Sequence, residues 1–208
     1  MSAARFHPWE LTGMVVLAFV LWYITFVLPW SSFWIKISLS ASLLAGISLF
    51  LYPLRAGELR FDLSGILIGL GSAVLLYFVF WTARAVSVAL FDFAGRQIAG
   101  IYDKGTGTPV WNIALLLFFV TGPGEEIFWR GCLQRNLMQR FGRWPGWAVA
   151  TAIYAAVHVC SLNFMLVGAA AVAGAFWGAM YARLGRLTPV ILSHSVWSTL
   201  IFAVFPMG

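Results

Sequence analysis

Charged residues are scarce in this chain. Of its 208 residues, 13 are lysine or arginine and seven are aspartate or glutamate, so 10% are charged while 62% are apolar. A soluble domain carries about 25% charged and 45–50% apolar residues, and a disordered chain combines low hydrophobicity with many charges. The scarcity of charge therefore excludes a water-soluble globule and a disordered protein, and it favours a chain that lies mainly within a lipid bilayer.

Cysteine is scarce as well. Cys132 and Cys160 are too few for a disulfide framework or a cysteine-based zinc site. The net charge of +6 does not predict nucleic-acid binding, because the basic residues are scattered between apolar runs and do not gather on one face. A cleavable signal peptide is not expected either, since the first apolar run, residues 11–30, is too long and lacks a small-residue cleavage site.

Seven apolar stretches divide the chain, and most approach the roughly 20 residues that a helix needs to cross a bilayer. They cover residues 11–30, 33–52, 63 to about 90, 110 to about 130, 147–160, 164–184 and 187–205. We therefore predict an all-α fold, a polytopic transmembrane helical bundle of about seven spans (six to eight). It forms one integral-membrane domain over residues 1–208. An additional helix near residues 90–101 is an alternative that would change the count.

The basic residues predict the orientation of these spans. With a cytoplasmic N-terminus, most arginines fall on inner segments, while the outer loops carry only Arg96 and Lys104. Cytoplasmic loops of membrane proteins carry such an excess of positive charge. We therefore expect the N-terminus inside and the C-terminus outside.

Two adjacent acidic residues, Glu125 and Glu126, stand out. The 12 apolar residues 110–121 are too short to cross a bilayer core of about 30 Å, so the fourth span must include the glutamates. We expect Gly122-Pro123-Gly124 to interrupt its helix and the span to surface near Arg130. Glu126 can pair with Arg130 at a spacing of four residues, whereas Glu125 is off that face. A central charge costs about 2.5–3.5 kcal/mol, so Glu125 needs a functional explanation.

Two histidines, His158 and His194, also lie within apolar spans. Either one alone is explained as a buried structural histidine. Helical rise puts both of them, and Glu125, about 8–16 Å below the inner surface, so we expect them to share one cavity. Ser198 lies one turn after His194 on the same face and adds a hydroxyl.

This set of side chains predicts attack of water on an amide. A carboxylate can act as general base, and histidines can donate hydrogen bonds to an oxyanion or bind zinc. The sequence contains no HExxH motif, no G-x-S-x-G motif and no pair of intramembrane aspartates. Other known classes of intramembrane hydrolase are therefore not indicated.

The motifs resemble those of the CPBP family, the CAAX protease and bacteriocin-processing (Abi) intramembrane endopeptidases. Glu125 to Arg130 matches its EExxxR motif, His158 its second motif, and the stretch ending at His194 and Ser198 its third region. The match covers residues 110–200, the expected catalytic core, and residues 1–109 would form N-terminal spans. Ser198 stands where the family often has asparagine.

The resemblance implies an intramembrane endopeptidase. Glu125 would activate water, Glu126 and Arg130 would orient it, and His158 would assist the water or the leaving group. His194 would stabilise the oxyanion together with Ser198. We expect no bound metal or other cofactor, with zinc as the open alternative.

The expected partners are a peptide or protein substrate with a membrane-associated segment and the lipid bilayer, with no nucleic acid. The short chain favours a prokaryotic cytoplasmic membrane. Two other functions remain open, a non-catalytic scaffold or binding protein on the same fold and a proton-coupled transporter.

Overall fold

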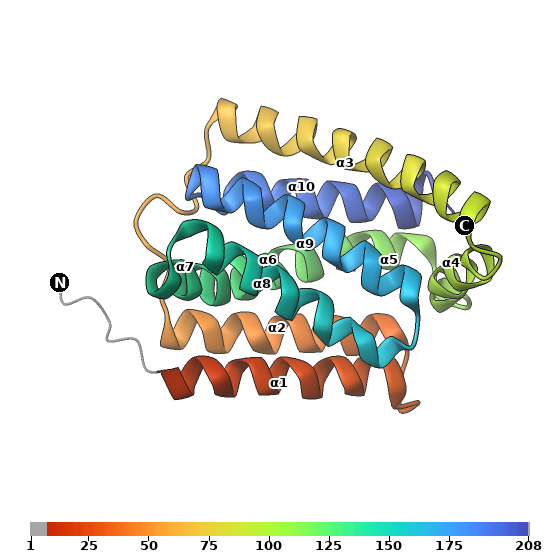
Figure 1. Cartoon of the computed structure of the whole chain (residues 1–208), viewed down its shortest axis with the longest axis horizontal. Coiled ribbons are helices and arrows are strands. Elements are labelled where there is room, and N and C mark those ends of the chain that lie inside the picture. Colours follow the sequence, from red (N-terminus) through yellow and green to blue (C-terminus); the bar gives the residue numbers. More distant parts are fainter. Residues whose placement is uncertain (1–7, 208) are drawn as a thin grey trace.

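The computed structural model describes residues 8–207, and within them the chain forms helices and no strand. The predicted all-α class is therefore confirmed. The helices pack as an elongated bundle, with α1 and α3 on opposite sides and α10 beneath α3 (Figure 1). Their bounds are α1 Pro8–Val27, α2 Phe33–Leu51, α3 Leu63–Leu90, α4 Ala94–Tyr102, α5 Val110–Leu116, α6 Gly122–Glu126, α7 Arg135–Phe141, α8 Arg143–Val157, α9 Phe164–Leu184 and α10 Thr188–Thr199.

Several helices are long and apolar enough to cross a membrane, which agrees with the predicted multi-pass bundle. Five stretches meet this requirement, and a shorter apolar helix covers Thr188–Val204. The predicted fifth span is α8, whose 15 residues end at Val157, directly before the buried His158. The alternative helix near residues 90–101 exists as the nine-residue α4. The five long stretches are Trp9–Val27, Phe33–Leu51, Leu63–Leu90, Val110–Phe141 and Phe164–Leu184.

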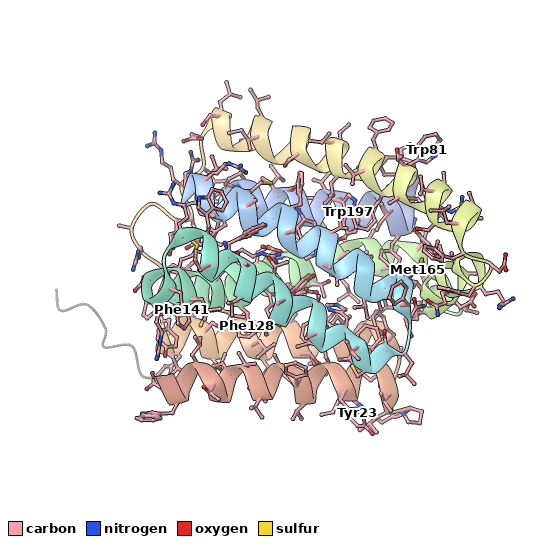
Figure 2. The ribbon with its side chains drawn as sticks, in the orientation of Figure 1. Tyr23, Trp81, Phe128, Phe141, Met165 and Trp197 are labelled. Atoms are coloured by element: carbon pink, nitrogen blue, oxygen red, sulfur yellow. The ribbon has the colours of Figure 1, made fainter. Side chains whose placement is uncertain are left out.

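Large apolar side chains cover the outside of the bundle. Trp81 on α3 and Tyr23 on α1 point away from it and are 58% and 50% exposed (Figure 2). In water such surfaces would cause association, whereas in lipid they contact acyl chains. The exposed surface therefore fits a bilayer as the surrounding solvent.

Glycines bring the helices close together. A methyl group on Gly69 of α3 would lie 2.9 Å from Leu192 Cβ of α10, and one on Gly174 of α9 would lie 2.8 Å from a ring carbon of Tyr154. In α6, a side chain at Gly124 would meet the backbone of Ala41 in α2 at 3.2 Å. Close helix packing through small residues is common in membrane proteins, and here it places α6 directly between α2 and α10.

The fourth span differs from the prediction. It does not surface near Arg130 but continues as one helical stretch from Val110 to Phe141, so Glu125 lies near its middle and deeper than expected. Arg130 is 2% exposed. We expected the span to end at Arg130 because an unpaired charge has to reach water. Here the carboxylate of Glu126 pairs with Arg130 inside the bundle, so the arginine does not end the span.

The expected break at Pro123 is also absent. Two π-helical segments, η2 (Leu117–Thr121) and η3 (Ile127–Gln134), flank α6 on either side. Proline lacks an N–H group and crowds the preceding turn, and the wider π turn accommodates it without ending the helix. Such π-helical turns occur frequently at functional sites, and these two enclose Glu125 and Glu126.

A buried ion pair joins the first spans to the rest of the bundle. Glu58, in the loop between α2 and α3, is 4% exposed and accepts hydrogen bonds from Arg135 Nη1 at 2.9 Å and from the Tyr181 hydroxyl at 2.7 Å. Its carbonyl oxygen accepts from the Leu187 amide at 2.8 Å. One loop residue thereby fixes α7, α9 and the start of α10 relative to α2.

Candidate active site

A cavity of about 440 Å³ lies between α1, α2, α3, α4, α6, α9 and α10. Aromatic and aliphatic side chains form most of its wall. Four of the six predicted site residues line it, namely Glu125, His158, His194 and Ser198. Two helices, α6 and α10, and the turn after α8 thus bring together residues that are up to 73 positions apart in the sequence.

Glu125 faces this cavity from α6 and is 8% exposed. Its Oε2 accepts a hydrogen bond from the Tyr154 hydroxyl at 3.1 Å. Among residues 8–207, no arginine, lysine or histidine forms an ion pair with it. Its carboxylate is therefore oriented by a neutral donor and is otherwise open to the cavity.

Glu126 points elsewhere and is fully buried. Its Oε1 accepts from Arg130 Nη1 at 2.8 Å, as the spacing of four residues predicts, and from His194 Nδ1 at 2.6 Å. Arg130 also donates to the Gly174 carbonyl at 3.3 Å and lies 5.0 Å from the centre of the Tyr154 ring. Glu126 and Arg130 thus form a buried unit behind the cavity wall.

His194 connects this buried unit to the cavity. Its ring stacks on Trp177 with 3.9 Å between ring centres and 16° between planes. Nδ1 donates to Glu126, while Nε2 makes no hydrogen bond to any of the described residues. Since the residue lines the cavity, Nε2 is the ring nitrogen that can meet a bound group.

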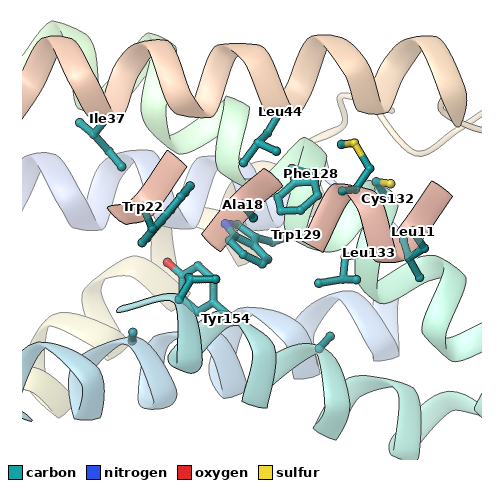
Figure 3. Packing of buried hydrophobic residues seen from close by; sticks show 14 of the residues in the cluster. Leu11, Ala18, Trp22, Ile37, Leu44, Phe128, Trp129, Cys132, Leu133 and Tyr154 are labelled. Atoms are coloured by element: carbon teal, nitrogen blue, oxygen red, sulfur yellow. The ribbon is translucent and has the colours of Figure 1, made fainter. Parts of the chain in front are cut away.

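His158 has both ring nitrogens occupied. Nδ1 donates to the Tyr154 carbonyl at 2.8 Å, and Nε2 accepts from the indole N–H of Trp22 at 3.1 Å. Trp22, Trp129 and Tyr154 gather in one aromatic group beside α8 (Figure 3). Direct assistance to water or a leaving group, the role implied by the resemblance, would require His158 to give up one of these bonds.

Ser198 lies one turn beyond His194 on α10, as expected from its spacing, and is 3% exposed. Within the described part of the chain its hydroxyl has no hydrogen-bond partner, and it borders the cavity. A hydroxyl has a single donor. Ser198 can therefore offer one hydrogen bond to a group bound beside His194.

The site does not present a metal-binding set. Residues 8–207 contain no group of three or more His, Cys, Asp and Glu side chains placed to hold one ion. A catalytic zinc site has three protein ligands, yet His158 has no free nitrogen and His194 offers only Nε2. The side-chain arrangement of the described residues therefore does not fit zinc.

Three residues of the site were not among the predicted ones. Tyr154 contacts Glu125, Trp22 contacts His158, and Trp177 stacks on His194. Tyr154 stands four residues before His158, so helical spacing was a signal for it. Trp22 lies 136 positions before His158, and Trp177 lies on α9 while His194 lies on α10, so local spacing gives no signal for these contacts.

Comparison with known proteins confirms the resemblance drawn from the motifs. A family model described as type II CAAX prenyl endopeptidase Rce1-like matches residues 107–200. These residues run from the loop before α5 into the last turn of the C-terminal helix. No curated protein and no solved structure matches the chain.

Proposed function

We propose that this chain, whose residues 107–200 match the Rce1-like type II CAAX prenyl endopeptidase family, is an intramembrane endopeptidase in which Glu125 activates water. One observation carries the proposal. Of two adjacent buried glutamates, Glu126 is neutralised by Arg130, whereas Glu125 faces a cavity with only a tyrosine hydroxyl as partner. A carboxylate held in this way suits a general base.

The reaction begins with a water molecule between Glu125 and the substrate carbonyl. Glu125 takes one proton from the water, and the water oxygen bonds to the carbonyl carbon. When the carbon–nitrogen bond breaks, the proton held by Glu125 passes to the departing amine. One carboxylate thus acts as base and then as acid, and Tyr154 keeps it oriented through both steps.

The negative charge that develops on the carbonyl oxygen requires hydrogen-bond donors. His194 Nε2 and the Ser198 hydroxyl border the cavity from the same face of α10. Because Nδ1 of His194 already donates to Glu126, the scheme requires a ring that carries a proton on Nε2 as well. Preorganised donors of this kind contribute about 3–4 kcal/mol each.

Glu126, Arg130 and His158 have positioning roles in this scheme. Glu126 and Arg130 fix the His194 ring from behind the cavity wall. His158 fixes the last turn of α8, which carries the Tyr154 side chain. None of the three needs to contact the substrate.

The substrate class follows from the cavity wall. Side chains such as Phe26, Phe80 and Ile98 surround the site, so a peptide next to a membrane-associated segment suits it better than a soluble, polar one. For this chain we propose a prokaryotic cytoplasmic membrane and a cytoplasmic N-terminus. The cavity then opens toward the other surface, because it lies at the end of the bundle where α1 ends and α2 begins (Figure 1).

Peptide hydrolysis by the purified protein in detergent micelles tests the proposed function. Glu125→Gln keeps the size of the side chain and the acceptor for Tyr154, and it should abolish cleavage without altering the unfolding temperature. Glu10→Gln is the matched control, since Glu10 pairs with Tyr52 away from the cavity. Full proteolysis by the Glu125 variant would refute the mechanism.

A further inference from the structure

We propose that Lys104 selects substrates that carry a carboxylate near the scissile bond and binds that carboxylate at the mouth of the cavity. This assignment rests on the proposed endopeptidase function. It adds a specificity residue from outside the three motifs that mark the family.

Lys104 follows α4 in the short helical turn η1 (Asp103–Gly105) and lines the same cavity as Glu125. Its Nζ lies over two aromatic rings, 5.4 Å from the centre of Phe26 and 5.2 Å from the centre of Phe33. Both rings belong to the cavity wall. The ammonium group thus lies over these two rings at the cavity, and the residue is half-buried.

No acidic side chain balances this charge. In the part of the chain that the structure describes, Lys104 has no ion pair, and its sequence neighbour Asp103 is exposed. Burial, and then the nearby ammonium of Lys36, lower the pKa of Lys104. Arg84, which lines the cavity from α3, also lacks an ion pair among these residues.

An unbalanced positive charge in an apolar cavity is costly unless an anion joins it. A bound carboxylate would supply the missing charge and a charge-assisted hydrogen bond. Peptide substrates carry carboxylates of two kinds, the C-terminal one and those of aspartate and glutamate side chains. Either kind would supply the missing charge.

The distance restricts where this carboxylate lies along the substrate. The Phe26 ring centre is 6.0 Å from the His158 ring centre, so Lys104 Nζ lies within about 11 Å of His158. The His158 ring is in turn 5.1 Å from the Tyr154 ring, which holds Glu125. An extended chain covers roughly 3.3–3.6 Å per residue. In a substrate bound in an extended form, the carboxylate is therefore no more than about six residues from the bond that is cleaved.

The test uses libraries of N-acetylated apolar peptides in detergent micelles. The peptides of the first library end in a free carboxylate, and those of the second end in an amide. The peptides of the third library end in an amide, and each carries one glutamate whose position differs from peptide to peptide. Cleavage is followed by mass spectrometry for the wild type, Lys104→Gln, Lys104→Arg and Arg96→Gln. Arg96, exposed on α4 and outside the cavity, is the matched charge control.

We expect the wild type to have a KM about tenfold lower for the carboxylate peptides than for the amides, in line with one charge-assisted hydrogen bond. Lys104→Gln should lose this preference with kcat unchanged, while Lys104→Arg and Arg96→Gln should keep it. The first and third libraries distinguish a C-terminal carboxylate from an acidic side chain. The same preference for carboxylate peptides in Lys104→Gln as in the wild type, or no such preference in the wild type, would overturn the assignment.

Binding without turnover keeps the test independent of the proposed function. Peptides of the three libraries are titrated onto the Glu125→Gln protein with and without Lys104→Gln, and the tryptophan fluorescence is followed. Loss of the carboxylate preference in the double variant supports the role of Lys104 even if no variant cleaves peptides. Anionic and neutral lipid micelles are titrated in the same way. If Lys104→Gln changes the difference in fluorescence response between anionic and neutral lipid micelles, and does not change the response to the peptides, Lys104 contacts lipid phosphate and the proposal is wrong.

Discussion

The Nδ1 atom of His194 lies 2.6 Å from Oε1 of Glu126, and Arg130 Nη1 lies 2.8 Å from the same oxygen. Two donors on separate helices therefore share one carboxylate oxygen in a fully buried position. This contact separates the roles of the adjacent glutamates. Glu126 fixes His194, and Glu125 is left to face the cavity.

Tyr154→Phe should slow cleavage because it removes the hydroxyl that donates to Glu125. A hydrogen bond to a charged group contributes about 1.5–3 kcal/mol, which corresponds to a decrease in kcat of about tenfold to a hundredfold. KM should change little, since the hydroxyl orients the base and does not need to bind substrate. Steady-state kinetics give both values. Tyr23→Phe, on the lipid-facing side of α1, is the control, and an unchanged kcat in Tyr154→Phe would show that the hydroxyl does not orient the base.

Arg130→Gln should destabilise the fold strongly. Removing one partner of a buried ion pair leaves the other charge unpaired and costs about 3–5 kcal/mol, and here Glu126 would keep only His194. The measurement is the thermal unfolding midpoint in micelles, compared with that of Arg96→Gln on the exposed face of α4. Equal midpoints for the two variants would mean that the buried pair does not stabilise the bundle.

Asp62 should make the fold sensitive to acid. Its carboxylate, at the start of α3, accepts hydrogen bonds from Arg186 at 2.8 Å and the Gly65 amide at 2.7 Å, and these hold its pKa well below the usual range. A group with a lowered pKa stabilises the fold above its ordinary value of about 3.9 and loses this contribution as the pH falls. The unfolding midpoint should therefore decrease less between about pH 5 and pH 2 in Asp62→Asn than in the wild type. Asp92→Asn, at an exposed position, should follow the wild type, and identical acid profiles for all three proteins would contradict the prediction.

The sequence predicted the helical class, the pairing of Glu126 with Arg130 and the grouping of Glu125 with His158, His194 and Ser198. These features depend on apolar runs and on helical spacing, which are local properties. The end of the fourth span was predicted wrongly, because Arg130 is satisfied by Gly174 of α9 and the ring of Tyr154 in α8. The partner of His158 was missed for the same reason, since Trp22 lies 136 positions away on α1. Contacts of this range follow from packing, which a single sequence does not show.

In the proposed mechanism, Glu125 activates water with the chain's own side chains. The most direct measurement is the initial rate of peptide hydrolysis in chelator-treated buffer, with the metal content of the protein determined on the same sample. We expect an undiminished rate for the wild type and no cleavage by Glu125→Gln, with or without chelator. A rate that chelator abolishes and zinc restores, or full activity in Glu125→Gln, would contradict this mechanism.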